Sequence, residues 1–278
     1  MKKAKVNGVE LEYEEQGSGE PILLVPNGPF ADCFVPLMSA PSLARRYRLI
    51  RYHQRGQAGS THTTAPVAFA DHAADAAALL AFLDAGRAHI VGHSTGAVIA
   101  LQLTIDSPEL VHTLVLLEPP LVAVPSAGAF FEKVGPALAA YGSGDREAAV
   151  AGFLSAVSGL EWEVCKSVLE QHVPGSVAQA VQDADNLFGS LLPALNEWAF
   201  GAEQAASISR PILSVLGAET EPWFADGHAL LRSWFAQLEE CKVDGAGHLL
   251  QMQQPEPVAR AISEFLARHS MAPAGSLR

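Results

Sequence analysis

The stretch Gly92-His93-Ser94-Thr95-Gly96 stands between an apolar run at 89–91 and a helical pattern at 97–105. A Gly-x-Ser-x-Gly pattern between a strand and a helix predicts a sharp turn that exposes the serine hydroxyl above a parallel sheet. Glycines on both sides of the serine avoid collisions with neighbouring backbone. The first turn of the helix also offers the Thr95 backbone N–H, which can stabilise an oxyanion. This stretch therefore predicts a nucleophilic serine, Ser94.

Strand-like and helix-like segments alternate on both sides of this turn. Short β-rich runs are expected at 9–14, 22–25, 48–52, 89–92 and 114–117, with helices at 70–83 and 97–105. The first of these runs alternates apolar and acidic residues, as a half-buried antiparallel edge strand does. The alternation of strands and helices predicts an α/β fold, with a mostly parallel sheet flanked by helices.

The alternation stops near residue 120. Between 121 and 205, stretches rich in Ala, Leu and Val show helical spacing without a convincing strand. Strand patterns resume at 211–217 and 238–243, and a last helix is expected at 257–269. We therefore expect a core formed by residues 1–120 and 206–278, with a helical cap inserted at 121–205.

A loop of small residues carries the expected general base. His248 follows the strand-like run at 238–243 and ends the sequence Gly245-Ala246-Gly247-His248. Such a loop lets an imidazole reach across to a serine, and histidine is the most frequent general base in enzymes. The other histidines lack this setting, and His93 is expected to pack beside the site.

Together these segments resemble the α/β-hydrolase superfamily, in its cap-bearing serine branch. The resemblance includes Val25-Pro26-Asn27-Gly28 after an early strand, residues 52–60 after the next strand, the Ser94 turn and the His248 loop. It covers nearly the whole chain. It implies an α/β-hydrolase fold and an acyl-enzyme formed on the serine, a mechanism that uses neither a metal nor a cofactor.

The residue that supports His248 departs from the common pattern of the superfamily. The usual Asp lies three residues after the Gly that ends the penultimate strand, and Thr220 occupies that place here. Glu219 and Glu221 flank it and are alternative acids. We favour Glu118, which ends an apolar run before two prolines, because zearalenone-type lactonases and similar hydrolases take their acid from this strand. A carboxylate there needs a partner when buried; the alternative to His248 is an arginine.

The early turn Asn27-Gly28-Pro29 raises a question about the oxyanion hole. The residue that normally offers a backbone N–H is Pro29, which has none. The expected donors are therefore Thr95 and either Phe30 or Gly28; otherwise this turn only shapes the pocket floor.

Aromatic residues are frequent in and beyond the expected cap. They are Phe130, Phe131, Phe153, Trp162, Phe188, Trp198, Phe200, Trp223 and Phe224. An aromatic lid on an acidic protein indicates a medium-sized apolar ester or lactone as substrate. Trp198, Phe188 and Trp223 are the candidate pocket residues.

The composition indicates which classes of binding partner and which cellular compartment to expect. The formal net charge of −12 disfavours nucleic acid and anionic membranes. No apolar run is long enough to span a bilayer, and no secretory signal is visible. The 3 cysteines show no CxxC spacing, so we expect reduced thiols, no metal site and a cytoplasmic protein. A monomer or homodimer is expected.

The expected activity is hydrolysis of a carboxylic ester or lactone. A carbon–carbon bond hydrolase or a perhydrolase would keep the same serine and histidine. A protein that binds a small ligand without turnover is the alternative from another class, suggested by Asn27, Pro29 and Thr220.

Overall fold

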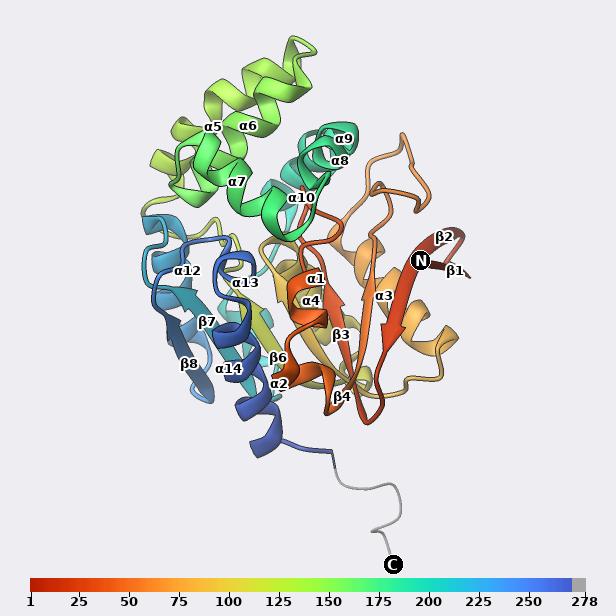
Figure 1. Cartoon of the computed structure of the whole chain (residues 1–278). Coiled ribbons are helices and arrows are strands. Elements are labelled where there is room, and N and C mark those ends of the chain that lie inside the picture. Colours follow the sequence, from red (N-terminus) through yellow and green to blue (C-terminus); the bar gives the residue numbers. More distant parts are fainter. Residues whose placement is uncertain (272–278) are drawn as a thin grey trace, which may run out of the picture.

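The computed structural model describes residues 1–271 and has a twisted sheet with helices on both faces (Figure 1). Within these residues the strand order is β1-β2-β4-β3-β5-β6-β7-β8. The strands are β1 (Lys2–Val6), β2 (Val9–Gln16), β3 (Glu20–Val25), β4 (Tyr47–Tyr52), β5 (Ala88–His93), β6 (Val111–Leu117), β7 (Ile212–Gly217) and β8 (Leu238–Val243). The pairs β1–β2 and β2–β4 are antiparallel and the other pairs are parallel. The predicted α/β fold is thus confirmed.

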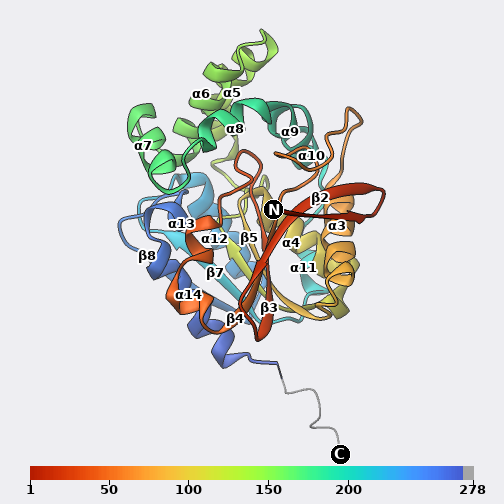
Figure 2. The ribbon, with the colours of Figure 1, turned by 45° about the vertical axis from the view of Figure 1, so that its right-hand side comes forward.

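The helices of the core lie on both faces of this sheet (Figure 2). On one face α1 and α2 pack against α14, and on the other α3 packs against α4. The core helices are α1 (Val35–Met38), α2 (Pro41–Ala44), α3 (Phe69–Phe82), α4 (Thr95–Asp106), η1 (Pro108–Leu110), α12 (Pro222–Trp234), α13 (Leu250–Gln253) and α14 (Pro255–Arg268).

Between β6 and β7 the described chain contains helices and no strand. The segments are α5 (Ala127–Gly142), α6 (Arg146–Ser158), α7 (Trp162–His172), α8 (Ser176–Gln182), α9 (Ala184–Asn186), the π-helical η2 (Leu187–Leu191), α10 (Leu192–Glu197) and α11 (Ala202–Ala206). Figure 1 shows α5 to α10 above the sheet, and Figure 2 shows α11 back beside the core helices. We call α5 to α10 the cap.

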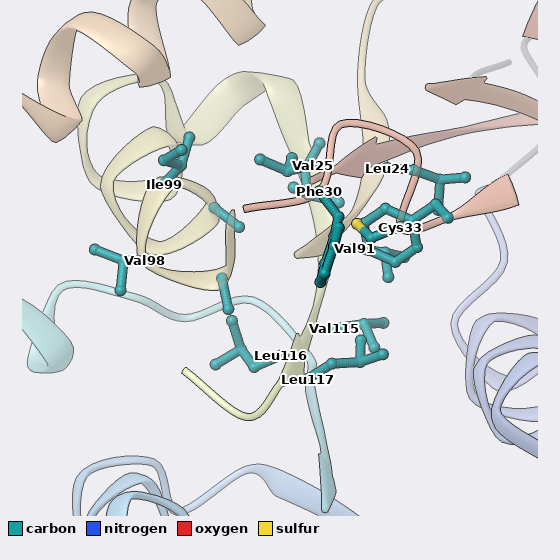
Figure 3. Packing of buried hydrophobic residues seen from close by; sticks show 14 of the residues in the cluster. Leu24, Val25, Phe30, Cys33, Val91, Val98, Ile99, Val115, Leu116 and Leu117 are labelled. Atoms are coloured by element: carbon teal, nitrogen blue, oxygen red, sulfur yellow. The ribbon is translucent and has the colours of Figure 1, made fainter. Parts of the chain in front are cut away.

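The core forms where the central parallel strands meet their helices. All six residues of β5 are buried, because helices cover both faces of this strand. Figure 3 shows side chains of the central strands packed with those of α4 and of the loop after β3. The labelled residues are Leu24, Val25, Phe30, Cys33, Val91, Val98, Ile99, Val115, Leu116 and Leu117.

Among residues 1–271, no single helix is long and apolar enough to cross a membrane. The pair α6 and α7 reaches that length and composition only when the two helices are taken together, across a bend of 92°.

Helix α4 approaches the end of β3 very closely at Gly96. A Cβ atom on this residue would overlap the carbonyl oxygens of Val25 and Pro26. Both atoms belong to the backbone and cannot swing away as a flexible side chain could. Glycine is therefore required here because of space, and the requirement fixes where the serine turn sits on the sheet.

We expect Gly96→Ala to lower the free energy of unfolding by about 2 kcal/mol or more, because the backbone of β3 or α4 must shift. Gly128→Ala is the matched control: Gly128 is exposed in α5, precedes an alanine, and has no atom of a more distant residue within 4 Å of its added Cβ. That change should stabilise the protein by about 0.5–1 kcal/mol. Urea unfolding followed by circular dichroism measures both, and equal effects of the two variants would contradict this reading.

Candidate active site

Ser94 occupies a strained turn between β5 and α4. Its backbone angles are φ 54° and ψ −126°, a conformation that non-glycine residues rarely adopt. The Ser94 N–H donates a hydrogen bond of 2.9 Å to the carbonyl of Leu117 at the end of β6. Strain of this kind persists only where the surroundings enforce it, and it is frequent at functional sites.

Glu118 follows β6 and lies directly against His248. Its Oε2 atom is 2.8 Å from the Nδ1 atom of His248 and also accepts a 2.8 Å hydrogen bond from the Thr220 hydroxyl. Its Oε1 atom accepts a 2.8 Å bond from the Gly217 N–H. Glu118 is also a non-glycine residue with positive φ, 47°. Thus the carboxylate is buried but has three donors, as a buried charge requires.

Burial sets the protonation of this pair. It raises the pKa of the Glu118 carboxyl to about 7, against the hydrogen bonds from Gly217 and Thr220, which lower it. Burial also lowers the pKa of the His248 imidazole to about 3. His248 is therefore neutral at neutral pH. With its proton on Nδ1 toward Glu118, the lone pair of Nε2 is left to accept a proton.

Ser94 and His248 line the same small cavity. The cavity offers about 20 Å³ to the centres of water molecules, which is room for about one water. Most of its wall is apolar. The lining residues are Asn27, Pro29, Phe30, His93, Ser94, Thr95, Phe153, Leu154, Val157, Leu187, His248 and Leu249.

The two alternative acids lie away from the His248 ring. Glu219 is exposed to solvent, and Glu221 forms an ion pair of 2.9 Å with Lys133 of α5. Of the three carboxylates expected to support His248, only Glu118 is bonded to the imidazole in the described chain. Thr220, at the place of the usual Asp, instead donates a hydrogen bond to Glu118.

The backbone donors expected for an oxyanion differ in availability. Thr95 lines the cavity and begins α4, so its N–H has no partner within the helix. The Phe30 N–H donates instead to the Asn27 side-chain oxygen at 2.9 Å. The Phe30 N–H therefore already has an acceptor, because the Asn27 side chain turns back on its own loop. Gly28 is the remaining candidate for a second donor.

The three expected pocket aromatics do not line the cavity. Trp198 stacks on Phe200 and donates a hydrogen bond to Gln102. Trp223 is buried, and Phe188 is stacked on Tyr141. These rings fill gaps between helices, which is the usual use of a large apolar side chain. The cap contributes Phe153, Leu154, Val157 and Leu187 to the wall instead.

A neutral imidazole connects the loops of the site, and sequence reasoning did not foresee its partners. The Nε2–H of His93 donates to the backbone carbonyl of His248 at 2.8 Å. Its Nδ1 atom accepts from the side-chain amides of Asn27 at 2.8 Å and Gln251 at 2.9 Å. Burial lowers the pKa of His93 to about 3, so the ring stays neutral. The unusual Asn27 was the one signal in the sequence for this network.

No group of three or more His, Cys, Asp or Glu side chains that could hold a metal occurs in the described part of the chain.

Similarity to known proteins agrees with this geometry. Residues 21–255 match the family described as "alpha/beta hydrolase fold". The chain is 26% identical over 275 residues to a 2-(acetamidomethylene)succinate hydrolase of Mesorhizobium japonicum, covering 95% of this chain and 94% of that protein. It is 35% identical over 120 residues to the uncharacterised hydrolase YraK of Bacillus subtilis, covering 42% of this chain. The chain spans less than half of the length of the first curated relatives that it matches, 42–44%.

Solved structures share the fold at low sequence identity. The enol-lactonase of Burkholderia xenovorans superposes with a TM-score of 0.79 at 19% identity, covering 96% of this chain and all of that one (100%). A thermophilic esterase of Thermogutta terrifontis superposes with a TM-score of 0.78 at 21% identity, covering 97% and 100%.

The fold and site together define a class, the hydrolase-type α/β proteins. The defining features are a mostly parallel sheet, a Gly-x-Ser-x-Gly turn, a histidine after the last strand and a helical insertion. The chain belongs to the alpha/beta hydrolase fold family. Membership supports hydrolase activity, and the zearalenone-type position of the acid stays a prediction.

Buried neutral histidines make the fold sensitive to acid. Burial lowers the pKa of His72, His93 and His248 to about 3 and that of His89 to about 4, from an ordinary 6.5. The unfolded chain therefore binds more protons below pH 6.5, and stability falls as the pH drops. Glu118 acts oppositely, since its raised pKa lets the folded state bind one extra proton between about 7 and 4.5. Because four histidines act in one direction and one carboxyl in the other, the net effect of acid is to lower the stability of the fold.

We therefore expect the free energy of unfolding to fall between pH 7 and pH 5, by about 1.4 kcal/mol per pH unit for each net proton. Urea titrations at several pH values measure this slope. His72→Leu removes one buried imidazole outside the site. The slope of the unfolding free energy against pH should then become shallower, by the amount that corresponds to about one bound proton. Stability that is constant or rises toward pH 5 would contradict the expectation.

Proposed function

We propose that this protein is a serine hydrolase that cleaves a carboxylic ester or lactone of a small to medium apolar substrate through an acyl-enzyme on Ser94. One observation carries the proposal: the neutral imidazole that shares a cavity with Ser94 is hydrogen-bonded to the buried Glu118 at 2.8 Å. A hydroxyl, an imidazole and a carboxylate in this order are the components of nucleophilic acyl transfer.

In the first step the Ser94 Oγ attacks the carbonyl carbon, and the Nε2 atom of His248 takes the hydroxyl proton. The imidazolium that forms is stabilised by Glu118, which already accepts the Nδ1–H. The imidazolium then gives its proton to the departing alkoxide, and the alcohol leaves. For a lactone the alcohol stays attached to the acyl chain.

Backbone N–H groups stabilise the negative charge that develops on the carbonyl oxygen. The Thr95 N–H at the start of α4 is the first of these, supported by the dipole of that helix. Gly28 is the remaining expected donor, because the N–H of Phe30 is already bonded to Asn27; Gly28 lies between two residues of the cavity wall but is not itself part of that wall. Removing one such donor commonly costs about 3 kcal/mol of transition-state stabilisation.

In the second step water attacks the acyl-enzyme while His248 takes one of its protons. The tetrahedral intermediate collapses, His248 returns that proton to the Ser94 Oγ, and the acid leaves. The balance is one ester and one water giving one acid and one alcohol, with the protein unchanged.

The wall of the cavity supports an apolar substrate. Phe153, Leu154, Val157 and Leu187 from the cap, with Leu249 from the core, offer no charge to the reacting group. Related folds include proteins named as an esterase and an enol-lactonase. A small-molecule ester or lactone is thus the proposed substrate. The protein is proposed to act as a monomer or homodimer. Free thiols at all three cysteines support a proposed cytoplasmic location.

We expect a fluorophosphonate to label Ser94 covalently, and p-nitrophenyl esters to be hydrolysed with an initial burst, because the serine is activated by a neutral imidazole. Mass spectrometry of the labelled peptide and stopped-flow absorbance measure these. Ser94→Ala should abolish both signals and keep the fold. Substrate binding with neither label nor burst in the wild type would favour a non-catalytic binding protein. Cleavage of carbon–carbon but not ester substrates, or peracid formation, would redirect the assignment on the same residues.

The assignment of the acid has its own test. We expect Glu118→Gln to lower kcat by about 10³-fold or more, because the amide no longer holds the imidazole in the required tautomer. Glu219→Gln and Glu221→Gln should leave kcat within a few-fold, since neither side chain touches His248. Steady-state kinetics on a p-nitrophenyl ester compare the three variants. Normal turnover in Glu118→Gln with loss of turnover in either control would reassign the acid.

A further inference from the structure

The side chain of Phe224 lies flat on the imidazole of His248. The ring centroids are 3.8 Å apart and the planes differ by 10°. Phe224 is buried in the first turn of α12, and it is not among the residues that line the cavity with Ser94. Its contact is therefore with the imidazole and not with the space that a substrate would enter.

The stack continues from the core into the cap. Trp223 is 5.3 Å from Phe224 and 3.8 Å from Phe130 of α5, measured between ring centroids. The indole N–H of Trp223 donates to the carbonyl of Leu121 at 2.7 Å, in the chain that leads into the cap. Phe130 also meets Phe224 edge-on at 6.1 Å, so a cluster of three aromatic rings joins the base of the cap to His248.

Polar contacts hold the same two elements together beside this cluster. The Ser126 N–H donates to the Asp226 carboxylate at 3.2 Å, just before α5 begins. Lys133 of α5 forms an ion pair of 2.9 Å with Glu221, the residue before α12. The start of α12 is therefore attached to the base of the cap at points on both sides of Phe224 in the sequence.

The hydrogen bond from His248 to Glu118 does not by itself fix the plane of the imidazole. It fixes the direction of the Nδ1–H, but the ring can still tilt about that direction and move Nε2 away from the Ser94 hydroxyl. The nearby His93 ring is 4.7 Å away and inclined by 37°, so it does not lie flat on the imidazole as Phe224 does. A flat aromatic contact restrains this tilt. The face of an aromatic ring also attracts a cation, so it favours the imidazolium that forms during acyl transfer.

We propose that Phe224 is a positioning residue for His248, and that helix α5 supports it through Phe130 and Trp223. The proposal rests on the proposed function, since it concerns the imidazole that would activate Ser94. It makes the cap part of the proton-transfer apparatus, in addition to its role as a wall of the pocket.

The test compares the rate of Ser94 labelling by a fluorophosphonate, together with kcat and KM on a p-nitrophenyl ester. We expect Phe224→Leu to lower the labelling rate and kcat about tenfold, with KM unchanged, because the ring restrains the base without lining the cavity. Phe224→Tyr keeps the planar ring and should retain most of the rate. Phe130→Leu removes a ring that meets Phe224 edge-on, with 6.1 Å between the centroids, and that does not touch His248, so it should give a smaller loss in the same direction.

Phe265→Leu is the matched control, because Phe265 is also a buried phenylalanine against a histidine, with 4.8 Å between its ring centroid and that of His269. It should lower the melting temperature and leave the labelling rate unchanged. Where Phe224→Leu does not fold, Phe224→Met takes its place.

The outcomes separate the two proposals. Absence of labelling in the wild type overturns the proposed function. Labelling of the wild type with an equal rate in Phe224→Leu overturns the positioning role, as does an equal loss in Phe265→Leu or a loss in Phe224→Tyr as large as in Phe224→Leu.

Discussion

The hydrogen bond between Glu118 and His248 constrains the carboxyl ends of the strands β6, β7 and β8. It joins the end of β6 to the loop after β8, and it removes a carboxylate from water, so further donors must be supplied. Gly217 and Thr220, at the end of the intervening β7, supply them. Three neighbouring strand ends are thereby fixed to one side chain. Glu118 meets these donors from a backbone with a positive φ, a conformation that is costly for a non-glycine residue.

Ser94 depends on the same strand ends. Its N–H is bonded to the carbonyl of Leu117, the residue before Glu118, so the turn with the hydroxyl and the turn with the carboxylate are adjacent. Both turns contain a non-glycine residue with positive φ. His93 adds the third connection, because it bonds to the carbonyl of His248 and accepts from Asn27 in the loop after β3. The parts of the site are thus held by backbone groups as much as by side chains.

Local features of the sequence predicted the fold and the segments that the structure brings together at the candidate site. Alternating strands and helices, the Gly-x-Ser-x-Gly turn and the Gly-rich loop at His248 all depend on short-range geometry, which residue type and spacing report directly. The Glu-Pro-Pro ending of β6 also pointed to Glu118, whose contact with His248 the structure contains.

What the sequence did not predict depends on contacts between distant segments. The bond from Thr220 to Glu118 and the network around His93 need coordinates, because no spacing rule connects these residues. The bond from the Phe30 N–H to Asn27 is local, and a turn of this kind is a known habit of asparagine, but its effect on the oxyanion donors is evident only in the structure. The same holds for the pocket. Trp198 could be recognised as a large apolar residue, but not as one that pairs with Gln102 and Phe200 instead of facing Ser94.

The size of the cavity at Ser94 has a kinetic consequence. Space for about one water is smaller than an ester, so side chains that line this cavity would have to move before the ester of the proposed reaction could reach Ser94. If that movement comes before binding, the observed association rate equals the encounter rate multiplied by the fraction of molecules whose cavity is open. A crystal lattice that holds these side chains in place would then keep an ester out during soaking, whereas crystallisation from a mixture with the ester would let them move first.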